Sequence, residues 1–210
     1  MTEGAGFVGK FGSDAPPLPP TRPGADTIGM AAPIYFTADM VRALPEDGNR
    51  YEVVHGELLV TPAPRATHQA LVLRLGAALL TYLEENPVGV ALLSPADISW
   101  GRADVLVQPD VFVVALEEAR TLDWNRMREL LLVAEVLSPS TARADRFVKR
   151  RRYQEAGVPV YWIIDADARQ VEVWTPGVEF PHVERERLTW HPAGAARAFE
   201  LELERLFRPL

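Results

Sequence analysis

The stretch LLLVAEVLSPSTARADRFVKRRRYQEAG, Leu130–Gly157, together with VPVYWIID that follows it, decides the fold. Apart from Glu135, its first eight residues are all aliphatic, which is typical of a buried strand. The turn SPST leads into a helix that we expect over residues 142–156, and Gly157 suits the position just after a helix end. A second apolar strand comes next. A strand–helix–strand crossover of this kind joins parallel neighbours in one sheet.

Glu135 is the polar exception in the first strand. Burying an unpaired carboxylate costs several kcal/mol or forces it to protonate, so Glu135 needs partners. A second acid, Asp110, follows Pro109 and precedes the apolar run VFVV. If the two strands are neighbours, both side chains can converge at one end of the sheet.

Two carboxylates that lie close together repel each other unless a cation lies between them. Mg²⁺ and Mn²⁺ prefer carboxylate and carbonyl oxygens, so Asp110, Glu135 and the carbonyl of Val136 are candidate metal ligands. The spacing alone allows an equally good structural explanation, because a Pro-Asp pair at a strand start is often a turn or cap.

The helix after Glu135 carries Asp145, Lys149 and Tyr153 at i, i+4 and i+8, hence on one face. Lys149 could reach the acidic site and stabilise developing charge there. The same helix has a basic run, and we consider four of its residues as phosphate contacts: Arg143, Arg146, Arg150 and Arg152. The competing interpretation is a solvated helix face with an internal Asp145–Lys149 ion pair.

Upstream, the pattern predicts a short helix beginning at Thr37 and two strands joined by a turn at His55-Gly56. A long amphipathic helix should end at Asn86. Next we expect a strand over 89–100, and then either a strand pair or one interrupted strand over 105–116.

Downstream of the crossover, residues 168–176 read as the hairpin partner of the second strand, and 178–210 stay undecided between strand and helix. The sum is an α/β (α+β) fold, a mixed β-sheet flanked by helices. Residues 34–210 form the predicted single domain. Residues 1–33 contain six Gly and six Pro and are expected to be a disordered tail.

The composition of the chain excludes several kinds of site and partner. The chain has 210 residues, 48% of them hydrophobic, and a net charge of −7, which argues against non-specific coating of nucleic acid by the whole surface. It has no Cys, so disulfides and thiolate metal sites are excluded. No apolar run reaches the roughly 18 residues of a membrane span. We therefore expect a cytoplasmic protein with no membrane partner.

Three segments together resemble a known family: YEVVHGELLVTPAPRATHQALVLRL, QPDVFVV and LLVAEVLSPSTARADRFVKRRRYQEAGVPVYWIID. In order and spacing, roughly over residues 35–176, they look like the Uma2 family, bacterial restriction endonuclease-like proteins once described as a domain of unknown function. That family belongs to the PD-(D/E)xK nuclease superfamily. The resemblance implies a restriction-endonuclease-like core and a Mg²⁺- or Mn²⁺-dependent endonuclease that acts on DNA.

The resemblance also implies roles for residues. Asp110 and Glu135 match the superfamily acids, but Leu137 holds the lysine position. Lys149, on the following helix, matches the place to which the family lysine has moved. A further hairpin acid is usual, for which we prefer Glu57 to Glu52.

His68 matches a recurring family histidine, and it could equally be a cap or core-edge residue. The sequence also departs from the family, with HGE where Asp-Gly-Glu is commoner. A homodimer would suit the activity, since cutting both strands of a duplex commonly needs two sites.

Two other classes stay open. A catalytically inactive nucleic-acid-binding or regulatory module could keep the same fold, although drift would first remove charges from a buried site. A glycosidase also needs two carboxylates, but it has no use for a lysine on a basic helix.

Overall fold

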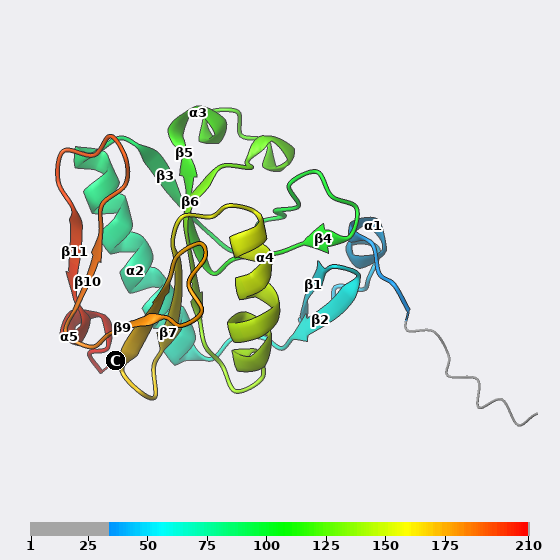
Figure 1. Ribbon diagram of the computed structural model, residues 1–210. Helices are drawn as coiled ribbons and strands as arrows, with labels where there is room; N and C mark the ends of the chain where they lie inside the picture. Colours follow the sequence, from blue (N-terminus) through cyan, green and yellow to red (C-terminus); the bar gives the residue numbers. More distant parts are fainter. Residues whose placement is uncertain (1–33, 210) are drawn as a thin grey trace, which may run out of the picture. The chain divides into compact units, whose positions relative to one another are not determined.

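A six-stranded mixed sheet forms the centre of the described part of the chain, residues 34–209 in a computed structural model (Figure 1). Its strands lie in the spatial order β3 (Gly89–Leu93), β5 (Val111–Ala115), β6 (Leu130–Val136), β7 (Tyr161–Asp165), β8 (Gln170–Trp174) and β9 (His182–Glu184). β6 and β7 are parallel, and the other neighbouring pairs are antiparallel. The parallel pair confirms the predicted crossover, and the α/β fold with a mixed sheet flanked by helices is confirmed with it.

The crossover helix is not regular along its length. Residues 142–155 are helical, as predicted, but the segment η2 (Ala144–Lys149) is a π-helix, and α4 (Arg150–Glu155) continues it as an α-helix. The Arg150 N–H accordingly bonds to the Asp145 carbonyl five residues back. Gly157 follows the helix end with a φ of 75°, the conformation that glycine adopts at least cost. π turns of this kind often occur at functional sites.

The helix α2 (Ala66–Glu85) covers the opposite face of the sheet. Its buried positions recur with helical spacing, as the sequence predicted: Leu71, Val72, Leu75, Leu79, Tyr82 and Leu83. Trp162 and Ile164 of β7 point to this α2 side, whereas Tyr161 and Ile163 point to the η2–α4 side. The two cores are therefore separated by a single sheet that is buried on both faces.

A smaller sheet lies beside the first and holds β2 (Glu57–Thr61), β1 (Arg50–Val54) and β4 (Val105–Leu106) in that order. The predicted turn at His55-Gly56 is present, with positive φ at both residues, 52° and 81°, as a two-residue hairpin turn requires.

The region 105–116 is interrupted. β4 joins the small sheet and β5 joins the large one, so the residues between them, including Asp110, bridge the two sheets.

The C-terminal region resolves the undecided pattern. β10 (Arg187–Trp190) and β11 (Phe199–Glu202) form a hairpin, and the short helix α5 (Leu203–Leu206) follows at once. Strand alternation thus gives way to helical spacing within FELELERLF. The remaining short helices are α1 (Ala38–Arg42), α3 (Leu116–Ala119) and the 3₁₀ turn η1 (Trp124–Arg126).

The expected disordered tail, residues 1–33, lies outside the described residues. The described residues, 34–209, belong to one compact unit. Within residues 34–209, no helix combines the length and the apolar character needed to cross a membrane.

Two neighbouring leucines on α2 test the assignment of its buried face. Leu79 is fully buried and Leu80 is 51% exposed. We expect Leu79→Ala to lower the free energy of unfolding by about 2–5 kcal/mol because it leaves a cavity. Leu80→Ala should change it by less than about 0.5 kcal/mol. Urea denaturation of both variants measures this difference, and equal losses would contradict the packing described.

Candidate active site

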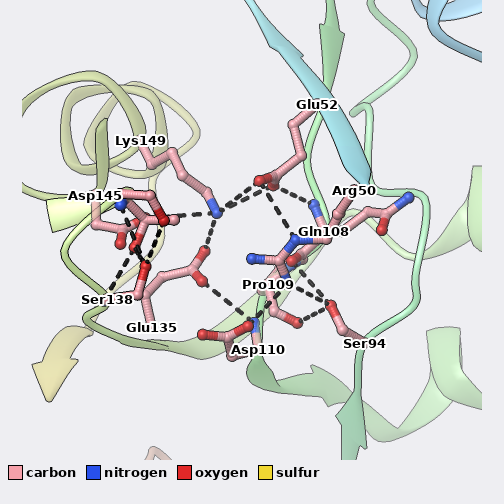
Figure 2. Close-up of polar contacts among 12 residues, drawn as sticks. Arg50, Glu52, Ser94, Gln108, Pro109, Asp110, Glu135, Ser138, Asp145 and Lys149 are labelled. Carbon is pink, nitrogen blue, oxygen red and sulfur yellow. Dashed lines mark hydrogen bonds and ion pairs between the residues drawn. The ribbon is translucent and has the colours of Figure 1, made fainter. Parts of the chain in front are cut away.

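Three elements bring the predicted Asp, Glu and Lys together at one end of the large sheet (Figure 2). Asp110 immediately precedes β5, Glu135 lies near the end of β6, and Lys149 closes η2. Glu135 shares its face of the sheet with Val133, which packs on the η2–α4 side. The crossover helix therefore delivers Lys149 directly onto Glu135.

The two acids are held together through the backbone. The Asp110 N–H donates to Glu135 Oε2 at 3.3 Å, and the Val136 N–H donates to Asp110 Oδ2 at 2.9 Å. These contacts follow from the antiparallel pairing of β5 and β6, in which Val111 lies opposite Ala134. Each carboxylate is thus anchored on the neighbouring strand, and the backbone of Val136 lies beside Asp110.

Lys149 is almost completely buried, at 1% exposure, and is surrounded by carboxylates. Its Nζ lies 2.6 Å from Glu135 Oε1, 3.0 Å from Glu52 Oε1 and 3.7 Å from Asp145 Oδ1. A buried ammonium is tolerated only with such partners. The π turn carries both Asp145 and Lys149, so it contributes two of the four charges in this cluster.

Of the two hairpin acids, the structure places Glu52 beside Lys149, and it places the preferred Glu57 away from the cluster. Glu52, on β1, is 1% exposed, and its Oε1 accepts from the Gln108 N–H at 2.7 Å. Glu57 is exposed at the start of β2, opposite Val54. The sequence could not separate the two acids, because the choice depends on which hairpin residue faces the large sheet.

Two further side chains hold Asp110. Arg50 NH1 lies 2.8 Å from Asp110 Oδ1, and His68 Nε2 lies 3.0 Å from Oδ2. His68 lies in the first turn of α2. The sequence left its role open, and the structure places it in contact with Asp110. Arg50 was missed, although it lies two residues before Glu52 in the same strand and therefore faces the same way.

Tyr153 completes the contacts of Glu135. Its hydroxyl donates to Glu135 Oε1 at 2.8 Å. Asp145, Lys149 and Tyr153, which the sequence places on one helix face, thus all point toward this acid or its lysine.

The electrostatics follow from burial and from these contacts. Burial raises the pKa of Asp110, but the His68 hydrogen bond and the charge of Arg50 outweigh it, so its pKa lies well below the ordinary value. Burial raises the pKa of Glu135 far above its ordinary value, with Lys149 opposing. Burial lowers the pKa of Lys149, but Glu135 and Glu52 more than compensate, so Lys149 stays an ammonium at neutral pH.

The four arginines predicted as phosphate contacts have different surroundings. Arg146 pairs with Asp165 and Glu172 at 3.0 and 2.8 Å. Arg150 lies over the Trp174 ring, and Arg152, which is buried, lies over the Trp100 ring. Arg143 is exposed. Three of the four thus already have partners within the chain, so a role in binding phosphate stays a prediction.

A cavity of about 860 Å³ gives access to the cluster. Its walls include residues of β1, the amino end of α2, the loop after β3 and the turn after β6. Among the residues that line it are Arg50, His68, Ser94, Asp110 and Thr141. Asp110 thus borders open space, whereas Lys149 and Glu135 lie behind it.

The donor chemistry fits a divalent cation. Asp110 and Glu135 are oxygen donors held side by side, and Mg²⁺ is commonly bound by one or two carboxylates with water and substrate phosphate supplying the rest. Within residues 34–209, no group of three or more His, Cys, Asp and Glu side chains is arranged to hold an ion by itself.

Comparison with known proteins agrees with this architecture. A crystal structure described as a putative nuclease belonging to DUF820, from Anabaena variabilis ATCC 29413, superposes with a TM-score of 0.67 at 22% identity. The match covers 82% of this chain and 97% of the other, so the two share a fold. The likeness therefore extends over nearly the whole fold, the mixed sheet and the helices that flank it.

The family profile of Uma2, described as "Putative restriction endonuclease", matches residues 38–204. The chain belongs to the Uma2 family. No curated protein matches it.

Lys149 offers a direct test of the buried charge cluster. Lys149→Met leaves three buried carboxyl groups without their cation, and we expect it to lower the free energy of unfolding by about 3–5 kcal/mol. Adding Glu135→Gln should recover part of the loss. Urea denaturation provides the measurement, with Arg143→Met as an exposed control. A loss below about 1 kcal/mol in Lys149→Met would contradict the pairing.

Asp145 predicts a pH dependence. Burial raises its pKa from 3.8 to about 6, with Lys149 opposing, so the folded chain binds this proton more tightly than the unfolded chain does. Its contribution to stability therefore falls as the pH rises from about 4 to about 6. Relative to the wild type, Asp145→Asn should gain on the order of 1–3 kcal/mol over this range. Thermal melts of the two proteins at several pH values measure the difference, and a difference that does not change with pH would contradict this assignment.

Proposed function

We propose that this protein is a metal-dependent endonuclease that hydrolyses phosphodiester bonds of DNA. Asp110 and Glu135, with the Val136 carbonyl, would hold Mg²⁺ or Mn²⁺, and Lys149 would act as the catalytic lysine. The observation that carries the proposal is the ammonium of Lys149 at 2.6 Å from Glu135, with Asp110 fixed beside it. Membership of a family described as "Putative restriction endonuclease" supports the substrate class.

Each residue of the cluster has a task in such a reaction. A bound Mg²⁺ would lower the pKa of a ligated water and offset the charge of the phosphate. Lys149 stays protonated and can hold the attacking water or stabilise the charge that develops on the phosphate. Glu52 and Tyr153 keep Lys149 and Glu135 in position through the contacts at 3.0 and 2.8 Å.

The cavity supports an approach of the DNA strand from the β1 side, since Asp110 and Arg50 line it. A homodimer, which would place two sites on a duplex, and a cytoplasmic location stay predictions.

The inactive binding module is the alternative. The cluster disfavours it, because four buried carboxyl groups, three of them around Lys149, are costly to keep without a use. The glycosidase reading is weaker still, because Lys149 contacts the acid that a glycosidase would need free.

Cleavage of supercoiled plasmid in Mg²⁺ or Mn²⁺ tests the proposal. We expect the wild-type protein to nick or linearise the plasmid, with no cleavage in excess EDTA. Asp110→Asn and Lys149→Met should each lower the cleavage rate by about 100-fold or more, because each removes a group that acts on the transition state. Asp167→Asn, which changes an exposed carboxylate, should cut at the wild-type rate.

Two outcomes would contradict the proposal. Cleavage by Asp110→Asn at the wild-type rate would remove the metal assignment. Salt-dependent DNA binding without cleavage under any divalent metal would favour the inactive module.

A further inference from the structure

Arg50 is the charged side chain of the site to which neither the sequence nor the family comparison gave a role. It begins β1, is about one-fifth exposed, and lines the cavity. Its NH1 donates to Asp110 Oδ1 at 2.8 Å and to Ser94 Oγ at 3.4 Å, and its Nε lies 3.8 Å from Glu52 Oε2. Figure 2 shows Arg50 between Glu52 and Asp110 on the side opposite Lys149.

The hydrogen bonds of the two acids show which oxygens remain available. Asp110 Oδ2 receives both the Val136 N–H and His68, and Glu135 Oε1 receives both Lys149 and Tyr153. A carboxylate oxygen has two acceptor positions, so these two oxygens are filled. Asp110 Oδ1 has only Arg50, and Glu135 Oε2 has only the Asp110 N–H. A cation held by both acids would therefore use Oδ1 and Oε2.

A divalent ion at Oδ1 would meet Arg50 directly. Mg²⁺ lies about 2.0–2.1 Å from its oxygen ligands, and the guanidinium nitrogen already lies 2.8 Å from that oxygen. A dication and a guanidinium that close repel each other, and they do so more strongly in a partly buried site than in water. The ion and Arg50 in its present position thus compete for one oxygen.

The cavity beside Arg50 offers its side chain a second position. Its Nε is buried and has no hydrogen-bond partner, so the donor set of the guanidinium is not satisfied in its present position. The adjacent cavity of about 860 Å³ is the space through which a phosphate would reach Asp110. A guanidinium binds phosphate oxygens in a fork geometry that a lysine cannot reproduce. Lys149, fully buried among its carboxylates, has no comparable freedom.

We propose that Arg50 is the resident counter-cation of the acid pair in the metal-free protein and binds the substrate phosphate once a divalent ion takes its place at Asp110. This inference rests on the proposed metal-dependent nuclease. With a divalent ion bound at Asp110, Arg50 would leave Oδ1 and its guanidinium would complete the phosphate site.

The test titrates Mn²⁺ alone, without DNA, into the full chain by calorimetry. We expect Arg50→Gln to bind Mn²⁺ about tenfold more tightly than the wild type, because the competing charge is gone. Its cleavage rate should nevertheless fall at least tenfold, because the phosphate contact is also gone. Arg120→Gln, an exposed arginine outside the cavity, should change neither value.

Arg50→Lys separates the two roles and covers the case in which Arg50→Gln fails to fold. It keeps the positive charge, so Mn²⁺ affinity should stay within about threefold of the wild type. The KM for plasmid should rise at least fivefold, because lysine lacks the paired N–H donors with which a guanidinium binds phosphate. An unchanged KM in Arg50→Lys would overturn the proposal. So would Mn²⁺ affinity in Arg50→Gln equal to or weaker than that of the wild type.

Asp110→Asn distinguishes this failure from failure of the proposed function. If Asp110→Asn abolishes Mn²⁺ binding and Arg50→Gln leaves it unchanged, the metal site stands and the role of Arg50 falls. If the wild type, Arg50→Gln and Asp110→Asn all fail to bind Mn²⁺, both proposals fall.

Discussion

The buried ion pair between Lys149 and Glu135 is the constraint on which the rest of the site depends. An ammonium and a carboxylate, 2.6 Å apart and each about 1% exposed, are stable only if further polar groups share the charge. Glu52, Asp145 and Tyr153 supply these groups. They come from the hairpin of the small sheet and from the crossover helix, so the pair ties together the elements on one side of the sheet.

The course of the backbone positions the residues that surround this ion pair. The parallel pairing of β6 and β7 requires a crossover, and the crossover helix begins with a π turn that buries both Asp145 and Lys149. On the opposite side, the interruption between β4 and β5 places Asp110 between the two sheets, within reach of Arg50 and His68. Four carboxyl groups thus face two permanent cations, Lys149 and Arg50. A divalent ion would balance the negative charge of those carboxyl groups that are ionised.

Much of this arrangement could be predicted from the sequence because it is encoded locally. The aliphatic strand around Glu135, the positive-φ turn at His55-Gly56 and the Gly157 helix end each follow from neighbouring residues. The choice of Glu52 over Glu57, the contact of Arg50 and the π turn could not. They depend on how the hairpin packs against the large sheet, a contact between segments far apart in the chain. The basic run of the crossover helix suggested a surface for binding phosphate. Three of its arginines have partners within the chain, which composition alone cannot reveal.

The central claim is that the acids beside Lys149 form a site for a divalent cation. An anomalous difference map from crystals soaked in Mn²⁺ tests it most directly. We expect one strong peak about 2.2 Å from both Asp110 Oδ1 and Glu135 Oε2, close to the metal–oxygen distances usual for divalent ions. A map without a peak between these two acids, or with Mn²⁺ bound only elsewhere, would contradict it.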